Sequence, residues 1–188
     1  MSALGRAFVA VVPPDHVLDA LEARVAPVRP AHDGLRWSRR EQWHLTLRFL
    51  GAVPDADALV TALGDALTTV PTMPDLQLGG AGAFPNARRA SVVWLGVRAG
   101  AGALGEVASA VESASAAAGF ASEPRPFAAH LTVGRVPRPR DVTAVLDALG
   151  VEAVGAAWPV DDVVLVSSDT RPTGAVYEEI ARIRLASP

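Results

Sequence analysis

The pattern of apolar and polar residues predicts six strands and four helices. Alternating or continuously apolar stretches, typical of half-buried and fully buried strands, cover 6–12, 43–50, 90–97, 129–136, 162–167 and 175–185. Apolar residues at helical spacing, some after start signals such as Pro14-Asp15, predict helices over 15–28, about 55–70, 104–119 and 141–149. Strands and helices therefore alternate along much of the chain.

Proline and glycine residues mark the expected interruptions between these elements. We expect a linker at 71–74, a turn at 79–82 and a break at Pro137 and Pro139 before the last helix. A turn-rich segment at 169–174 joins the last two strands. Short connections of this kind favour antiparallel pairing.

These patterns predict an α+β fold with two similar halves. The sheets of the two halves should be mainly antiparallel and should face a central cleft, with the helices outside. With 188 residues, the chain fits one domain over 1–188, built from two similar lobes.

Composition narrows the class of protein. Half of the residues are hydrophobic and there is no cysteine, which excludes disulfides and thiolate metal sites. No apolar run approaches the ~20 residues that span a bilayer, and the first residues lack the pattern of a signal peptide, so we expect a cytoplasmic protein with no membrane contact. A net charge of −3 argues against broad non-specific binding to nucleic acid.

All 17 basic residues are arginine. A GC-rich coding bias accounts for the absence of lysine, but it does not account for the clustering of arginines around two short segments. Arginine has the planar fork that matches phosphate oxygens. The clustered residues are Arg36, Arg39, Arg40, Arg48, Arg125, Arg135, Arg138 and Arg140.

Those two segments share a tetrapeptide. His44-Leu45-Thr46-Leu47 is followed 86 positions later by His130-Leu131-Thr132-Val133. On a strand, the His and Thr of each copy point to one face and the two aliphatic residues to the other. Two such strands at one cleft would present two imidazoles and two hydroxyls to the same ligand.

This set of groups suits acid–base chemistry on a phosphate. One imidazole can remove a proton from water while the other protonates a leaving oxygen. Thr46 and Thr132 can donate to phosphate oxygens, and Arg135 can neutralise negative charge. The alternative is that the threonines simply favour strands and that Arg135 is a solvated strand end; His16 and His32 lack such a context and are expected at the surface.

Competing motifs are absent from the sequence. There is no Walker phosphate loop, no His-Glu-x-x-His and no Gly-x-Ser-x-Gly elbow. Two histidines alone make a poor zinc site. We therefore expect neither a metal nor a cofactor.

The paired motifs resemble those of the 2H phosphoesterases, on 43–51 and 127–135. Within that superfamily the chain most resembles the RNA 2',3'-cyclic phosphodiesterases, historically named 2'-5' RNA ligases. Further similarity lies at 6–10, 82–85, 92–97 and 167–177, so the resemblance covers almost the whole chain. It implies a bilobal fold with pseudo-twofold symmetry and both motifs in a central groove.

The resemblance also implies a reaction and the roles of the residues. The reaction is metal-independent opening of a terminal 2',3'-cyclic phosphate to a 2'-phosphomonoester. His44 would be the general acid that protonates the departing 3' oxygen, and His130 the base that activates water. Thr46, Thr132 and Arg135 would hold the phosphate.

Two aromatic residues lie near the motifs, and the sequence differs from the family pattern at one position. Phe49 follows His44 by five residues, an odd number, so strand alternation places it on the opposite face and predicts that it packs in the core. Phe127 is then the better candidate for stacking on a base. Ala129 stands where many members carry proline before the second histidine, which loosens the backbone but removes no chemical group.

Two other functions remain open from the sequence. In the first, the same site catalyses the reverse reaction and acts as an RNA ligase. In the second, the chain is a non-catalytic module that binds RNA ends or nucleotides. The expected partner is RNA with a 2',3'-cyclic phosphate end or a cyclic nucleotide. A monomer is expected, because a self-contained cleft needs no second subunit.

Overall fold

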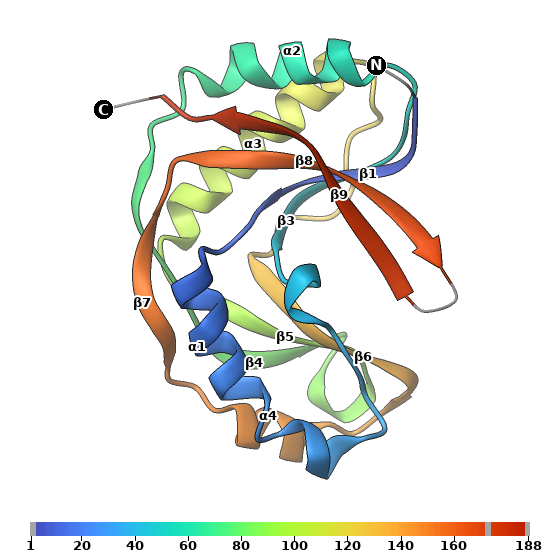
Figure 1. The fold of residues 1–188 in the computed structure, drawn as a ribbon, viewed down its shortest axis with the longest axis vertical. Helices are drawn as coiled ribbons and strands as arrows, with labels where there is room; N and C mark the ends of the chain where they lie inside the picture. Colours follow the sequence, from blue (N-terminus) through green and yellow to red (C-terminus); the bar gives the residue numbers. More distant parts are fainter. Residues whose placement is uncertain (1–2, 172–173, 187–188) are drawn as a thin grey trace.

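The computed structural model describes residues 3–171 and 174–186, which form an α+β fold (Figure 1). The α-helices are α1 (Asp15–Val25), α2 (Ala56–Leu67), α3 (Ala101–Ala117) and α4 (Thr143–Leu149). The strands are β1 (Leu4–Val11), β2 (Arg36–Trp37), β3 (Leu45–Val53), β4 (Met73–Phe84), β5 (Ala90–Ala99), β6 (His130–Arg140), β7 (Ala153–Val160), β8 (Asp162–Arg171) and β9 (Gly174–Arg184). Short 3-10 helices are η1 (Arg29–His32), η2 (Arg40–Gln42) and η3 (Ala87–Arg89).

The strand order places the two motif strands side by side. Hydrogen bonding gives the path β7-β4-β5-β6-β3-β1-β8-β9, with β2 added against β6, and the pairings between these strands are antiparallel. β6 and β3 stand at its centre with three strands beyond each of them. They are joined through one register pair, Leu45 with Leu131. Two halves meet along this seam, one of four strands and one of four strands with β2 added. The expected antiparallel α+β class is confirmed.

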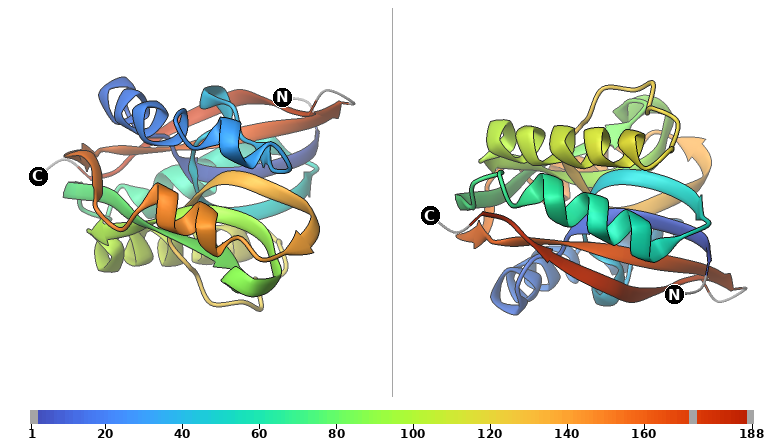
Figure 2. Two further views of the ribbon diagram at one scale, coloured as in Figure 1. Left: turned by 90° about the horizontal axis from the view of Figure 1, so that it is seen from below. Right: turned by 90° about the horizontal axis from the view of Figure 1, so that it is seen from above.

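The helices lie outside the sheet. α2 packs against α3, and Figure 2 shows these two helices side by side. In the other half, α1 contacts β7 and α4 contacts β4. The main hydrophobic core includes residues from these helices and from both halves of the sheet.

Local signals explain why the helices begin and end where they do. Asp55 caps α2, because its side chain accepts a hydrogen bond from the Ala58 backbone N–H at 3.0 Å. α3 is followed by Gly119, which adopts a φ of +91° that favours glycine. The expected glycine end of this helix is thus confirmed.

Two local predictions were wrong, and three strands were missed. The glycines at 79–82 lie inside β4, where a register shift between Leu78 and Ala81 forms an irregularity and not a turn. Pro137 and Pro139 do not end β6, which continues to Arg140. The strands β2, β4 and β7 were not predicted at all, and β4 begins inside the expected linker at 71–74. The turn residues 172–173 lie outside the described part.

A second, smaller apolar cluster lies apart from the main core. It consists of Phe8, Ala10, Val164 and Val166, with Tyr177 packed against it. Register pairs join Phe8 to Val166 and Ala10 to Val164, so these residues share one face of neighbouring strands. This face carries the pocket described below.

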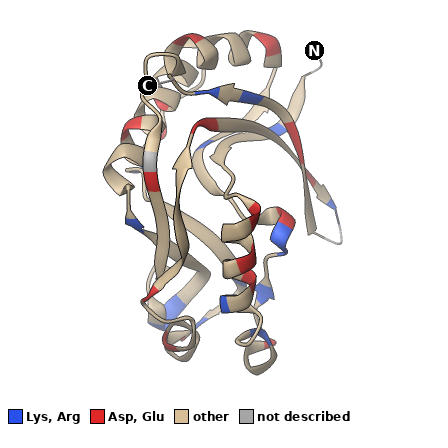
Figure 3. Ribbon diagram, turned by 60° about the vertical axis from the view of Figure 1, so that its left-hand side comes forward, with Lys and Arg blue, Asp and Glu red and all other residues tan. Residues whose placement is uncertain are grey.

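The surface shows no single dominant charge. Acidic and basic residues are interspersed over both halves (Figure 3). Among the described residues, no helix is both long enough and apolar enough to cross a membrane.

Candidate active site

The two His-x-Thr motifs meet at the seam between the halves of the sheet. Leu45 and Leu131, which pair across the seam, are both fully buried in the core. Alternation along each strand therefore turns the neighbouring histidines and threonines to the opposite face. Those four side chains, at 44, 46, 130 and 132, are all half-buried. The structure brings together the residues that the sequence singled out.

The two histidines take corresponding positions on the two strands. Leu45 lies opposite Leu131 in the register pair that joins β3 to β6, and His44 directly precedes β3 while His130 begins β6. Each histidine is thus the residue directly before one leucine of that pair. A single phosphate at the seam is then within the span of groups from both strands.

Each imidazole is held in the same way by the backbone. His44 Nδ1 lies 2.8 Å from the Gln42 carbonyl oxygen, and His130 Nδ1 lies 2.7 Å from the Ala128 carbonyl oxygen. A carbonyl can only accept, so Nδ1 carries a hydrogen in both rings. This leaves both Nε2 atoms free to exchange a proton with a ligand.

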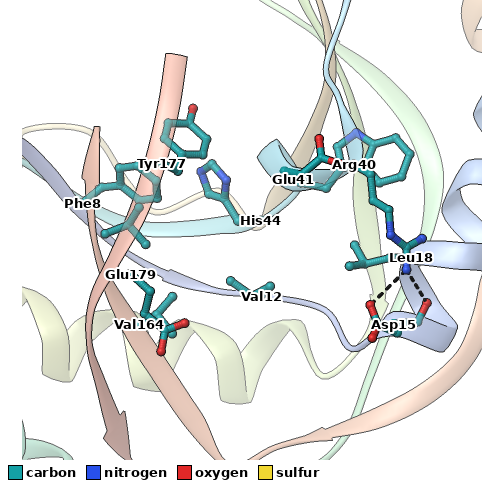
Figure 4. A pocket seen from close by; sticks show the side chains of 12 residues that line it. Phe8, Val12, Asp15, Leu18, Arg40, Glu41, His44, Val164, Tyr177 and Glu179 are labelled. Carbon is teal, nitrogen blue, oxygen red and sulfur yellow. Dashed lines mark hydrogen bonds and ion pairs between the residues drawn. The ribbon is translucent and has the colours of Figure 1, made fainter. Parts of the chain in front are cut away.

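Aromatic rings enclose His44. Phe8 stacks on the imidazole with ring centroids 4.5 Å apart, and Tyr177 meets it edge-on at 5.3 Å. No direct signal for these contacts exists in the sequence, although Tyr177 is the only tyrosine of the chain. Figure 4 shows the three rings together at one end of a pocket.

The surroundings of His44 favour its neutral form. Burial lowers the pKa of His44 from 6.5 to about 4, and the charges of His130 and Arg135 act in the same direction, whereas the hydrogen bond to Gln42 opposes them. The electrostatic effects also show that His130 and Arg135 lie near this imidazole. Free His44 is therefore uncharged at neutral pH.

His130 has its own aromatic neighbours. Phe84 meets the imidazole edge-on at 4.9 Å, and Trp94 lies tilted at 6.2 Å. Trp94 is the register partner of Thr132 on β5, while Gly96 pairs with His130 itself. Both histidines are thus positioned by two aromatic rings and one carbonyl.

A β-bulge interrupts each motif strand at the same place. In β3 the register shifts between Thr46 and Arg48, and in β6 it shifts between Thr132 and Gly134. A bulge adds one residue and so reverses the alternation beyond it. The reversal is visible at Val133 and Gly134, which are consecutive and both buried, and it leaves Arg135 exposed.

Arg135 consequently joins the face that carries the histidines. Its charge acts on His44 and also on Tyr177. Burial raises the pKa of Tyr177, and the charge of Arg135 acts in the opposite direction. Plain alternation from His130 would have put it on the other face. It pairs with Arg36 of β2, so two guanidinium groups adjoin the site.

The bulge in β3 overturns the prediction for Phe49. Its side chain is 58% exposed and does not pack in the core. Phe49 lies opposite Phe8 in the register, with ring centroids 6.0 Å apart. It occupies in the first motif the position that Arg135 occupies in the second.

Other predicted residues lie away from this centre. Arg48 is buried, where it forms an ion pair with Glu112 and donates to the Ala121 carbonyl, so its role is structural. Arg40 pairs with Asp15 and Asp19 of α1. His16 is exposed and His32 is half-buried, with neither at the seam.

Phe127 precedes β6 in a loop. Its side chain is 37% exposed, and it does not line the pocket beside His44. Its role in stacking on a base stays a prediction.

A pocket of about 340 Å³ opens beside His44. The small apolar cluster and Val12 contribute its apolar wall, and Asp15, Glu41 and Glu179 also line it (Figure 4). Within the described ranges, no three His, Cys, Asp or Glu side chains are grouped so that they could hold a metal ion.

The sequence model of the 2'-5' RNA ligase superfamily matches residues 17–172. The chain belongs to this superfamily. The resemblance to the 2H phosphoesterases is thereby confirmed, and both motifs fall inside the matched region.

Curated relatives of this superfamily member are named RNA 2',3'-cyclic phosphodiesterase. The protein of Aeropyrum pernix is 31% identical over 84% of this chain and 91% of the relative. That of Archaeoglobus fulgidus is 32% identical over 93% of this chain and 97% of the relative. These matches confirm the expected class of enzyme, a phosphodiesterase.

Solved structures agree with the fold. A crystal structure of a Thermus thermophilus protein superposes with a TM-score of 0.76 at 28% identity, covering 97% of this chain and 98% of that one. Escherichia coli LigT, complexed with 3'-AMP, gives a TM-score of 0.76 at 26% identity over the same shares.

Proposed function

We propose that this protein hydrolyses 2',3'-cyclic phosphate ends of RNA to 2'-phosphomonoesters, without a metal ion. The observation that carries the proposal is the matched pair of imidazoles at the seam. Both Nδ1 atoms are anchored to backbone carbonyls, so both Nε2 atoms are available for proton transfer. The names of the relatives supply the substrate class.

The proposed reaction uses one proton transfer at each histidine. His130 Nε2 removes a proton from water as the water oxygen bonds to phosphorus. The bond from phosphorus to the ribose 3' oxygen breaks, and His44 Nε2–H gives its proton to that oxygen. The products are a 2'-phosphate, a free 3'-hydroxyl, a protonated His130 and a neutral His44, and exchange with solvent restores both rings.

Thr46, Thr132 and Arg135 stabilise the phosphate during this step. The hydroxyls donate to non-bridging oxygens, and the guanidinium neutralises charge that grows as water adds. Thr46 and Thr132 are half-buried on the same face as the histidines. Arg135 reaches this face because of the bulge in β6.

An extended RNA strand is favoured as substrate by arginines that lack acidic partners. Within the described ranges, Arg36, Arg135, Arg138 and Arg140 form no ion pair, and all four are exposed. They lie on the paired strands β2 and β6. Such groups suit phosphates upstream of the reacting end.

The superfamily's name favours a second candidate, ligation of the cyclic end to a 5'-hydroxyl. Microscopic reversibility permits it at the same two histidines. With water in large excess, hydrolysis dominates. Mainly 2'-5' junctions at physiological RNA concentration would reverse this ranking.

The test is incubation with a short RNA that ends in a 2',3'-cyclic phosphate, in excess EDTA, followed by phosphorus NMR. The wild-type protein should produce the 2'-phosphate signal. The His44→Ala variant should be slower by about 10²–10⁴-fold, and His16→Ala should match wild type. Activity that EDTA removes and an added metal restores would overturn the mechanism, and cyclic-end binding with no product would favour the non-catalytic module.

A further inference from the structure

Different groups surround the two histidines of the seam. Beside His44 lies the pocket of about 340 Å³, a volume in the range of about 300–1,000 Å³ that small-molecule sites occupy. Its wall includes Phe8, Val164 and Val166 from the small apolar cluster, which the main core does not share. Figure 4 shows Val12 between the His44 end and the Asp15 end of this space.

Beside His130, Trp94 takes up the room. A Cβ atom added at Gly82 would collide with the Trp94 ring, and one added at Gly96 would come within 3.3 Å of it. Phe84 lies against the same indole at 5.2 Å. The indole of Trp94 thus packs directly on the backbone of Gly82 and Gly96, in the space that a side chain at either position would need.

We propose that the pocket beside His44 binds the ribose and base of the 3'-terminal nucleoside. This inference rests on the proposed function. The oxygen that His44 protonates belongs to the ribose, so the ribose must lie on the His44 side of phosphorus. The attacking water, which is small, then comes from the His130 side, where Phe84 and Trp94 flank the imidazole.

The side chains around the pocket indicate which bases it prefers. Glu41 has no hydrogen-bond or ion-pair partner in the part of the chain that the structure describes, so its carboxylate is available to accept. Asp15, Glu179 and Arg40 also line the pocket. The Arg40 guanidinium is bound to Asp15 at 3.0 Å and to Asp19 at 2.7 Å, and Glu179 is paired with Arg182 at 2.6 Å. Carboxylates accept hydrogen bonds and do not donate them.

Guanine fits these acceptors best. Its Watson–Crick edge presents two adjacent N–H donors, at N1 and N2, that can pair with one carboxylate. Adenine and cytosine present one amino group each, and uracil presents one N–H between two carbonyl oxygens that a carboxylate repels. The expected order of preference is guanosine, then adenosine and cytidine, then uridine.

The first test blocks the pocket without disturbing the core. Val12 lines the pocket and is 42% exposed, so Val12→Trp adds a bulky ring there at an accessible site. Val151→Trp is the matched control, because Val151 is 69% exposed and does not line this pocket. KM and kcat are measured for the four nucleoside 2',3'-cyclic monophosphates.

Val12→Trp should raise KM tenfold or more for all four nucleotides, while Val151→Trp should match wild type. The second variant, Glu41→Gln, should lower the preference for guanosine over uridine by about tenfold, since a charged acceptor is lost. Glu106→Gln, an exposed position on α3, should leave the preference unchanged.

A binding assay separates this inference from the proposed function. Calorimetry with guanosine 2'-monophosphate needs no turnover, and Val12→Trp should weaken that binding tenfold or more. Wild-type turnover with unchanged KM and unchanged binding in Val12→Trp would overturn the pocket assignment and leave the function standing. Absence of wild-type turnover together with binding that Val12→Trp weakens would overturn the function and support the pocket.

Discussion

The proposed acid, His44, carries no proton on Nε2 in the free protein at neutral pH. Its pKa is lowered to about 4, first by burial. A general acid must be protonated when the leaving oxygen departs. We therefore predict that the substrate's own phosphate raises the pKa of His44 when it binds.

The size of this effect follows from Coulomb's law. One negative charge at about 4 Å, with an effective dielectric constant of about 20, stabilises an imidazolium by about 4 kcal/mol. At about 1.4 kcal/mol for each pKa unit, this is a rise of about three units. The pKa of His44 should then move from about 4 to about 7.

The assay is an NMR titration of protein labelled with 15N-histidine, with and without saturating adenosine 2'-monophosphate. His44→Ala assigns the resonances, and His16, which is exposed and away from the seam, is the internal reference. A His44 pKa that stays near 4 in the complex would show that the bound phosphate does not protonate this group. A free pKa near 6.5 would also contradict the prediction, because burial would then not control this group.

Three further predictions concern stability. Because the pKa of His44 is lower in the folded protein, the unfolded chain binds this proton at a higher pH than the folded protein does. The stability that the fold gains from neutral His44 is therefore fully present above pH 6.5 and is lost as pH falls towards 4. Denaturant titrations should show a loss of up to about 3 kcal/mol in that window, and an equally steep loss in His44→Ala would contradict it. Glu112→Gln leaves the buried Arg48 charge unpaired and should cost about 3–5 kcal/mol in urea unfolding; a cost below about 1 kcal/mol would show that the pair is weak. Phe49→Ala, at an exposed site, should lower the free energy of unfolding by less than about 1 kcal/mol, against about 2–5 kcal/mol for Leu131→Ala. Equal losses for the two variants would show that Phe49 packs in the core.

The motif residues could be predicted from the sequence because their face depends on local alternation. His44 and Thr46, like their counterparts, lie before the bulge in each strand, where the two-residue period holds. Phe49 and Arg135 lie beyond it. A bulge is set by the register of the neighbouring strand, which alternation within one strand does not reveal.

The errors at proline and glycine have a similar cause. Between Arg135 and Arg140 the register of β6 shifts strongly against β5. Pro137 and Pro139 fall in that stretch, where no ladder pair requires the N–H that they lack. In β4, Gly80 adopts a φ of +74° at the register shift against β5 between Leu78 and Ala81, and the strand continues because β5 and β7 pair with it on either side of that shift.

The pocket could not have been foreseen from the motifs. It is built by residues from β1, β8 and β9 together with α1 and η2. Val164 and Val166 carry no chemical signal in the sequence. Only the strand order places them beside His44.

The assignment of acid and base can be tested most directly with a sulfur substitution in the substrate. In an RNA whose terminal cyclic phosphate carries sulfur at the 3' position, the leaving thiolate needs little protonation. On this substrate His44→Ala should regain most of its lost rate, whereas His130→Ala should stay slow because water still needs a base. Rescue of His130→Ala and not of His44→Ala would contradict the assigned roles.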